Sequence, residues 1–120
     1  MSNIRPKTLI IDIDGTLFHH YGTGIAQSHI DLLLLPGVLN KFDEWDRKGY
    51  NIILMTGRRE SERELTTSQL HEHGIVYDQL IMGVGGGDRV LINDTKENSQ
   101  EPTAFGFTVK RNEGIGGLEI

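Results

Sequence analysis

The chain has 120 residues, 12 Lys and Arg against 17 Asp and Glu, and a formal net charge of -5. This length predicts a single domain over residues 1–120, because a second hydrophobic core would not fit. The acidic balance without a Lys/Arg cluster argues against nucleic acid as a partner. With no cysteine and no charged-then-apolar leader, we expect a cytoplasmic protein without disulfides. The longest apolar run, Leu32–Leu35, is far shorter than a membrane span.

The first predicted strand, Thr8–Ile13, ends in two acids. Asp12 and Asp14 stand at its carboxyl end, followed by Gly15 and Thr16. Open α/β folds bind ligands at the carboxyl ends of their strands, and carboxylates there suit a hard cation such as Mg2+ together with phosphate. One acid could attack phosphorus while the other moves protons. The alternative interpretation is that Asp-Gly-Thr is only a turn.

Two segments follow before the second strand. His19, His20 and Tyr21 could line a cleft entrance as a small flap, or be ordinary loop residues. Leu32–Leu35 is expected to be a buried segment that leads into a helix. That helix carries apolar residues at helical spacing and is expected to stop at Gly49. Its apolar positions are Val38, Leu39, Phe42 and Trp45.

The second predicted strand, Asn51–Met55, also ends in polar residues, Thr56, Gly57 and Arg58. A Thr hydroxyl and the following amide can bind a phosphate oxygen, and Arg suits bidentate phosphate contact. We therefore expect Thr56 and Arg58 to lie beside the acids of the first strand, since both strands end at the same edge of a parallel sheet.

The rest of the chain predicts one more helix and further strands. Ser61 and Glu64 have capping-box spacing at the start of a helix that runs to about His73, with Gly74 just past its end. The predicted strands are Leu80–Met82, Val90–Ile92 and Phe105–Val109, and Asn93 and Asp94 follow the second of these. Alternating strands and helices predict a three-layer α/β/α, Rossmann-like doubly wound parallel sheet. The glycine cluster at 83–87 does not fit a dinucleotide fingerprint.

Three segments together resemble the motifs of the haloacid dehalogenase-like (HAD) superfamily of Mg2+-dependent aspartyl phosphatases. They are Asp12-Ile13-Asp14-Gly15-Thr16, Thr56-Gly57-Arg58 and Asn93-Asp94. The resemblance covers the chain from Leu9 to about Thr95. It implies that Asp12 is the nucleophile and a metal ligand. It also implies that Asp14 is the general acid/base and offers its main-chain carbonyl to the metal.

The resemblance assigns the remaining site residues as well. Thr56 would bind the transferring phosphoryl group, and Asp94 would be the third metal ligand, with Asn93 holding ligands or water in place. Members often have two acids where this chain has Asn93 and Asp94, so one metal carboxylate fewer would weaken Mg2+ binding. The other residues expected to contact substrate are Gly15, Thr16, Gly57 and Arg58.

A departure from the superfamily pattern concerns lysine. Members usually carry a Lys between the second and last motifs, but this chain has none between Thr56 and Asn93. We expect Lys96 to supply the missing cation, with Arg89 as the second choice. For either residue a solvated surface charge is the ordinary alternative.

The superfamily often places a cap after the first motif. Residues 17–35 number only about 20, which is too few for an independently folded unit, so we expect a cap-less hydrolase core. The expected function is a Mg2+-dependent phosphatase that hydrolyses a phosphate monoester, such as a phosphosugar or polysaccharide precursor, through an aspartyl-phosphate. The alternative is a catalytically weak or inactive HAD-like protein that binds phosphate or a partner.

The C-terminal residues Arg111–Gly117 resemble the tail of small cap-less phosphatase-like proteins of polysaccharide biosynthesis. This resemblance implies that the tail covers the cleft or meets another subunit. Truncation after Lys110 should therefore alter turnover or assembly. The expected partners are a phosphorylated substrate and a second copy in a homo-oligomer, with no membrane contact.

Overall fold

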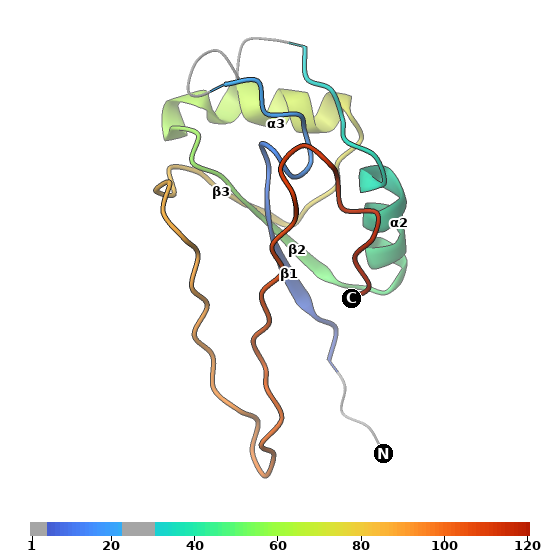
Figure 1. Cartoon of the computed structure of the whole chain (residues 1–120), viewed down its shortest axis with the longest axis vertical. Coiled ribbons are helices and arrows are strands. Elements are labelled where there is room, and N and C mark those ends of the chain that lie inside the picture. Colours follow the sequence, from blue (N-terminus) through green and yellow to red (C-terminus); the bar gives the residue numbers. More distant parts are fainter. Residues whose placement is uncertain (1–4, 23–30) are drawn as a thin grey trace.

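The computed structural model describes residues 5–22 and 31–120. Its sheet has three parallel strands in the order β1-β2-β3 (Figure 1). The strands are β1 (Thr8–Asp12), β2 (Asn51–Met55) and β3 (Gln79–Ile81). The connections hold helix α2 (Val38–Arg47) between β1 and β2, and the 3-10 turn η1 (Glu60–Glu62) with helix α3 (Arg63–Glu72) between β2 and β3. The α/β class with a Rossmann-like parallel sheet is confirmed.

The register of the strands brings their carboxyl ends level. Asp12 lies opposite Met55, and Met55 lies opposite Ile81. The residues that follow β1 and β2 therefore emerge at one edge of the sheet, as parallel pairing requires. This is the edge at which the sequence predicts a site.

The core lies between the sheet and the helices. Leu9, Ile52 and Leu54 point into it from alternate strand positions, and α2 contributes its apolar stripe. That stripe includes Phe42 and Trp45, which are almost fully buried. Each large apolar side chain buried in this way contributes about 1.5 to 3 kcal/mol. The core therefore fixes both helices against the strands that carry the acids.

The ends of helices α2 and α3 test the glycine stops and the capping box that the sequence predicts. Gly49 and Gly74 follow α2 and α3 with φ angles of 74° each, a left-handed conformation that glycine adopts without strain. The predicted capping box is wrong, because α3 begins at Arg63 and has no side-chain cap. The η1 turn precedes it, and Glu60 in that turn instead accepts a 2.7 Å hydrogen bond from Arg63.

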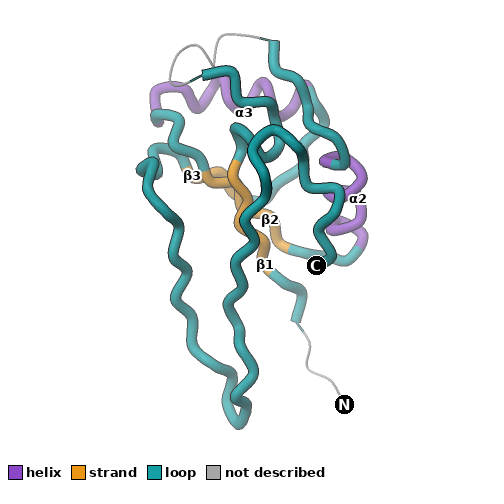
Figure 2. Tube along the Cα trace, viewed as in Figure 1, coloured by secondary structure: helices purple, strands orange, loops and turns teal. Residues whose placement is uncertain are grey.

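The segment 86–108, which we call the arm, forms neither of the two strands predicted for it. Val90–Ile92 and Phe105–Val109 have no assigned strand, and Figures 1 and 2 show the arm leaving the body as two extended legs. Its apolar side chains are exposed, with Ile92 90% accessible. Short apolar runs predict an extended backbone but do not specify its pairing partner. Consequently β1 is an edge strand of the described sheet.

Polar contacts tie the two legs of the arm to each other. The Asn93 side-chain amide donates to the Thr103 carbonyl at 3.4 Å, and the Thr103 hydroxyl donates to the Asp94 carbonyl. The arm runs back toward the end of the sheet where β1 begins (Figure 1). It thus extends away from the carboxyl ends of the strands.

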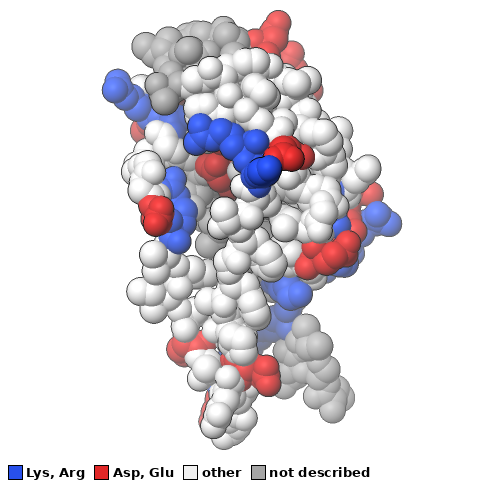
Figure 3. All heavy atoms as spheres, in the orientation of Figure 1, with Lys and Arg blue, Asp and Glu red and all other residues white. Residues whose placement is uncertain are grey.

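The surface gives two further findings. Among the described residues, no helix combines the length and the apolar character needed to cross a bilayer. On the face shown in Figure 3, basic and acidic side chains are interspersed without a basic stripe. This face offers no electrostatic track of the kind that follows a nucleic-acid backbone.

Candidate active site

The turn after β1 is built around one carbonyl group. The backbone amides of Thr16, Leu17 and Phe18 all point at the carbonyl of Ile13, at 3.2, 2.8 and 3.2 Å. Gly15 has a φ angle of 91°, which lets the chain reverse at that point. The sequence predicted a turn here, and the turn holds Asp12 and Asp14 on either side of a fully buried Ile13.

Protein atoms surround much of the Asp12 carboxylate, but the residue is still exposed to solvent. The Thr16 hydroxyl donates to its Oδ2 at 3.3 Å. Burial raises the pKa of Asp12 above its ordinary value, and the neighbouring Asp14 charge adds to the rise. Hydrogen bonds from the Ile13 backbone and Thr16, and the charge of Arg89, lower the pKa of Asp12. A carboxylate in this setting favours a nearby cation.

Asp14 is held by a bidentate ion pair with Arg58. Arg58 Nε donates to Asp14 Oδ2 and Nη2 donates to Oδ1, each at 2.8 Å. The guanidinium is buried, and Nη1 also donates to Thr66 Oγ1 at 3.0 Å and Gln69 Oε1 at 2.6 Å. Arg58 was expected to contact phosphate, but in this structure its donors serve Asp14 and helix α3. It therefore orients Asp14, a role that the sequence pattern did not indicate.

Thr56 lies at the end of β2, beside the turn of the first strand. Its side chain is 1% exposed, and its Oγ1 accepts a 3.1 Å hydrogen bond from the backbone amide of Arg58. The Thr56 carbonyl accepts from Val84 at 3.0 Å. Gly57 is close to the same segment, since a Cβ added there would lie 3.1 Å from the Val84 carbonyl oxygen. The second predicted motif thus joins the first at one edge of the sheet.

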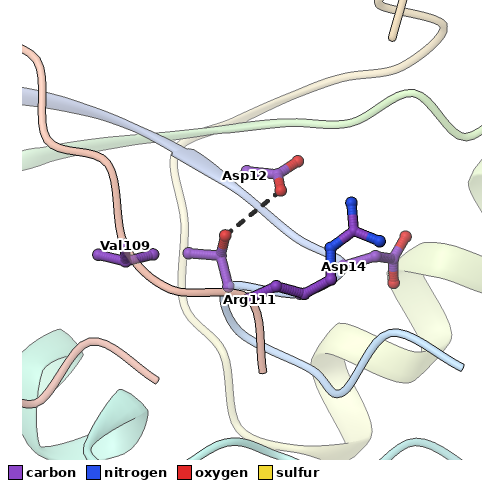
Figure 4. A pocket seen from close by; sticks show the side chains of 6 residues that line it. Asp12, Asp14, Val109 and Arg111 are labelled. Atoms are coloured by element: carbon purple, nitrogen blue, oxygen red, sulfur yellow. Dashed lines mark hydrogen bonds between the residues drawn. The ribbon is translucent and has the colours of Figure 1, made fainter. Parts of the chain in front are cut away.

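A pocket of about 190 Å³ opens over the first motif. Asp12, Asp14, Gly15 and Thr16, four of the residues predicted to form the site, line one part of it. Figure 4 shows the other part, formed by the C-terminal segment with Val109 and Arg111. The involvement of Arg111 was missed by sequence reasoning.

The C-terminal segment is fixed in place by several contacts. The Asn112 amide donates to the Gly15 carbonyl at 2.8 Å, and its Oδ1 accepts from the His20 amide at 2.6 Å. Ile115 enters the core, where it is 2% exposed. On either side, Gly114 and Gly116 pack against the Pro36–Gly37 backbone so closely that a Cβ on Gly114 would lie 2.2 Å from the Pro36 carbonyl oxygen. The tail predicted to cover the cleft therefore forms part of its wall.

The third predicted motif is not brought to this pocket. Asn93 and Asp94 lie on the arm, exposed to solvent, and Lys96 is exposed near them. Arg89 donates to the Gly85 and Gly87 carbonyls and acts on Asp12 through its charge.

The flap residues take a different position from the one expected. The rings of His19 and Tyr21 pack against each other 4.4 Å apart, and neither lines the pocket. Leu17 and His19 pair with the strand-like segment at Leu33–Leu35 through two hydrogen bonds of 2.8 Å. Residues 23–30 of the segment 17–35, which was expected to be too short for a cap, fall outside the described residues.

The oxygen donors at the pocket fit part of a magnesium site. Asp12 and Asp14 occupy one wall, and Mg2+ commonly uses one or two carboxylates with water and substrate phosphate. Across residues 5–22 and 31–120, no cluster of three or more His, Cys, Asp or Glu side chains is placed to hold a metal. A bound Mg2+ would therefore depend on substrate, water or the arm for its remaining ligands.

Comparisons with known proteins support the fold. No protein family model matches the chain, and no curated protein matches it either. A chain of the Pnkp1/Rnl/Hen1 complex is 31% identical over 74% of this chain, with a TM-score of 0.59. A second structure, of the Pnkp1/Rnl/Hen1 RNA repair complex, is 30% identical with a TM-score of 0.56. This chain spans only 32% and 28% of those two chains.

Two further structures are similar in fold. A structural genomics target from Vibrio cholerae is 23% identical, with a TM-score of 0.54 and coverage of 72% of this chain and 79% of that one. D,D-heptose 1.7-bisphosphate phosphatase from B. bronchiseptica, complexed with magnesium and phosphate, is 21% identical with a TM-score of 0.51. That likeness covers 68% of this chain and 52% of the phosphatase. The neighbours of this fold thus include a phosphatase.

Proposed function

We propose that the chain is a HAD-like, Mg2+-dependent phosphatase that hydrolyses a phosphate monoester. The observation that carries the proposal is the pairing of Asp12 and Asp14 in a pocket at the carboxyl ends of parallel strands. The second motif lies beside it, with Thr56 at the end of β2. The similarity to a phosphatase bound to magnesium and phosphate supports the same class of reaction.

In the proposed reaction, an Asp12 oxygen bonds to phosphorus as the bond from phosphorus to the leaving oxygen breaks. Asp14 donates a proton to that leaving oxygen. It then removes a proton from a water molecule, which attacks phosphorus and releases Asp12 and inorganic phosphate. Thr56 binds an oxygen of the transferring group. The proton that Asp14 gives to the leaving oxygen is thus replaced by the proton that it takes from water.

Magnesium has a defined place in this proposal. The Asp12 carboxylate and the Asp14 main-chain carbonyl would hold it. Asn93 and Asp94 stay predicted ligands, although the structure places them on the arm and outside this pocket. When bound, Mg2+ supplies positive charge that offsets the phosphate and the developing charge of phosphoryl transfer.

The Arg58 ion pair orients the Asp14 carboxylate and favours its charged form, so Asp14 must take up a proton before it can donate one to the leaving oxygen. A carboxylate offers about four lone-pair sites, and a bidentate guanidinium uses one on each oxygen. Arg58 therefore fixes the plane of the Asp14 carboxylate. The Asp14 side chain is 13% exposed, so that water can approach it.

We propose a phosphosugar or polysaccharide precursor as the substrate class. The acidic balance of the chain and the interspersed charges on the face shown in Figure 3 disfavour a nucleic acid. The similarity to a chain of an RNA repair complex makes an RNA terminal phosphate the substrate to compare with it. Assembly as a homo-oligomer stays a prediction. A phosphate-binding protein without catalysis is the competing function, supported by the position of Asp94 on the arm.

Hydrolysis of an aryl phosphate with and without Mg2+ tests the proposal. Wild type should hydrolyse the aryl phosphate only with Mg2+. The control variant Asp43→Asn should behave as wild type, because Asp43 is a surface residue that pairs with Arg47. Asp12→Asn should lose activity by more than about a thousandfold, as expected when a nucleophile is removed. Equal turnover by Asp12→Asn and wild type would reject the proposal.

A further inference from the structure

The C-terminal segment adds a cation to a pocket whose other lining residues include no Lys or Arg. Arg111 is the basic residue among those that line the pocket with Asp12 and Asp14. A Cβ added to Gly15 would lie 3.3 Å from Arg111 Cγ and 3.8 Å from its Nε, so this side chain crosses directly over the turn of the first motif. In Figure 4 the Arg111 side chain extends toward Asp14.

The other candidate cations are occupied or distant. Arg58 is buried and donates to Asp14, Thr66 and Gln69. Arg89 donates to carbonyl groups of the glycine-rich loop. Lys96, the residue expected from the sequence, is exposed on the arm. Within the described part of the chain, the salt bridges of the fold do not include Arg111.

The backbone of Arg111 is also held in position. Asn112, the next residue, is hydrogen-bonded to Gly15 and His20, and Ile115 anchors the segment in the core. The backbone of Arg111 is therefore fixed beside the pocket, while its side chain stays accessible to solvent. A planar donor group in this place suits an anion with several oxygens, and a phosphoryl group is such an anion.

We propose that Arg111 binds the phosphoryl group of the substrate and replaces the lysine that the chain lacks between Thr56 and Asn93. This inference rests on the proposed function for its substrate, but its ligand chemistry, a phosphate dianion, can be tested without turnover. The site is then shared between segments about a hundred residues apart, because Asp12 follows β1 and Arg111 lies on the C-terminal segment.

The test measures aryl phosphate hydrolysis and the binding of inorganic phosphate in the presence of Mg2+. The variants are Arg111→Met, Arg111→Lys and the control Lys110→Met. Lys110 is suited as a control because its side chain is 86% exposed, it pairs with Glu113 and it does not line the pocket. Thermal unfolding of each variant separates loss of binding from loss of fold.

We expect Arg111→Met to raise KM and weaken phosphate binding by about 10- to 100-fold, the effect of losing a hydrogen-bonded charge. Arg111→Lys should recover part of the loss, and Lys110→Met should behave as wild type. Hydrolysis and phosphate binding by Arg111→Met equal to wild type would overturn the inference and leave the phosphatase proposal intact.

The phosphatase proposal can also fail while the role of Arg111 in phosphate binding is supported. A wild type that binds phosphate through Arg111 without hydrolysing esters would support the inference and reject the phosphatase proposal. Phosphate binding that is absent in wild type would overturn the role of Arg111.

Discussion

Replacing Arg58 with Met tests whether the Asp14 ion pair supports the fold as well as the site. The change removes the guanidinium but keeps an unbranched apolar side chain. The Arg58 side chain is 4% exposed and that of Asp14 is 13% exposed, so the loss leaves a poorly solvated carboxylate. The Thr66 and Gln69 side chains also lose a donor.

The expected loss in the free energy of unfolding follows from these contacts. Breaking a buried ion pair by removing one partner costs about 3 to 5 kcal/mol, and the residual exposure of Asp14 places this case near about 3 kcal/mol. With a urea m-value of about 2 kcal/mol/M, the unfolding midpoint should fall by about 1.5 M.

Urea unfolding at neutral pH measures the effect against a matched surface arginine. Arg47 is 73% exposed and pairs with Asp43 at 3.0 Å, so Arg47→Met should cost about 0.5 kcal/mol or less. Arg58→Lys, which keeps the charge but loses the fork, should fall between the two. A midpoint for Arg58→Met equal to that of Arg47→Met would refute the reasoning.

Three further predictions address the acids, the C-terminal segment and the arm. Burial raises the pKa of Asp12, so the charged form of this side chain destabilises the fold. Above the raised pKa, Asp12→Asn should therefore be more stable than wild type, and below the ordinary carboxyl pKa the two proteins should be equally stable. Unfolding measured across pH tests this prediction. Gly114→Ala should cost at least about 2 kcal/mol because its φ angle is 85° and Pro36 blocks a Cβ, whereas Gly117→Ala, with open space around it, should be neutral in the same assay. Asp94→Asn should weaken Mg2+ activation of turnover if the arm reaches the site; an unchanged Mg2+ titration would remove Asp94 from the metal ligands.

Local signals explain what the sequence predicted well. The apolar runs of β1 and β2 fix extended segments, and Gly49 and Gly74 end the helices because they tolerate positive φ. The acids after β1 and Thr56 after β2 then meet because parallel strands align their ends. These features depend on neighbours in the chain or on one pairing rule.

The features that were missed depend on contacts between distant residues. The three apolar residues Val90–Ile92 indicate an extended backbone, but they do not specify which strand it pairs with. Arg111 reaches the first motif because Ile115 is anchored in the core between two closely packed glycines. The one available sequence signal was an isolated apolar residue flanked by Gly114 and Gly116, which indicates a tight backbone approach.

The most direct test of the central claim is the formation of a beryllium fluoride adduct, which mimics an aspartyl-phosphate, observed by fluorine NMR with Mg2+. The account predicts a protein-bound signal in wild type that is absent in Asp12→Asn and requires Mg2+. The same signal in both proteins would contradict the assignment of Asp12 as the nucleophile.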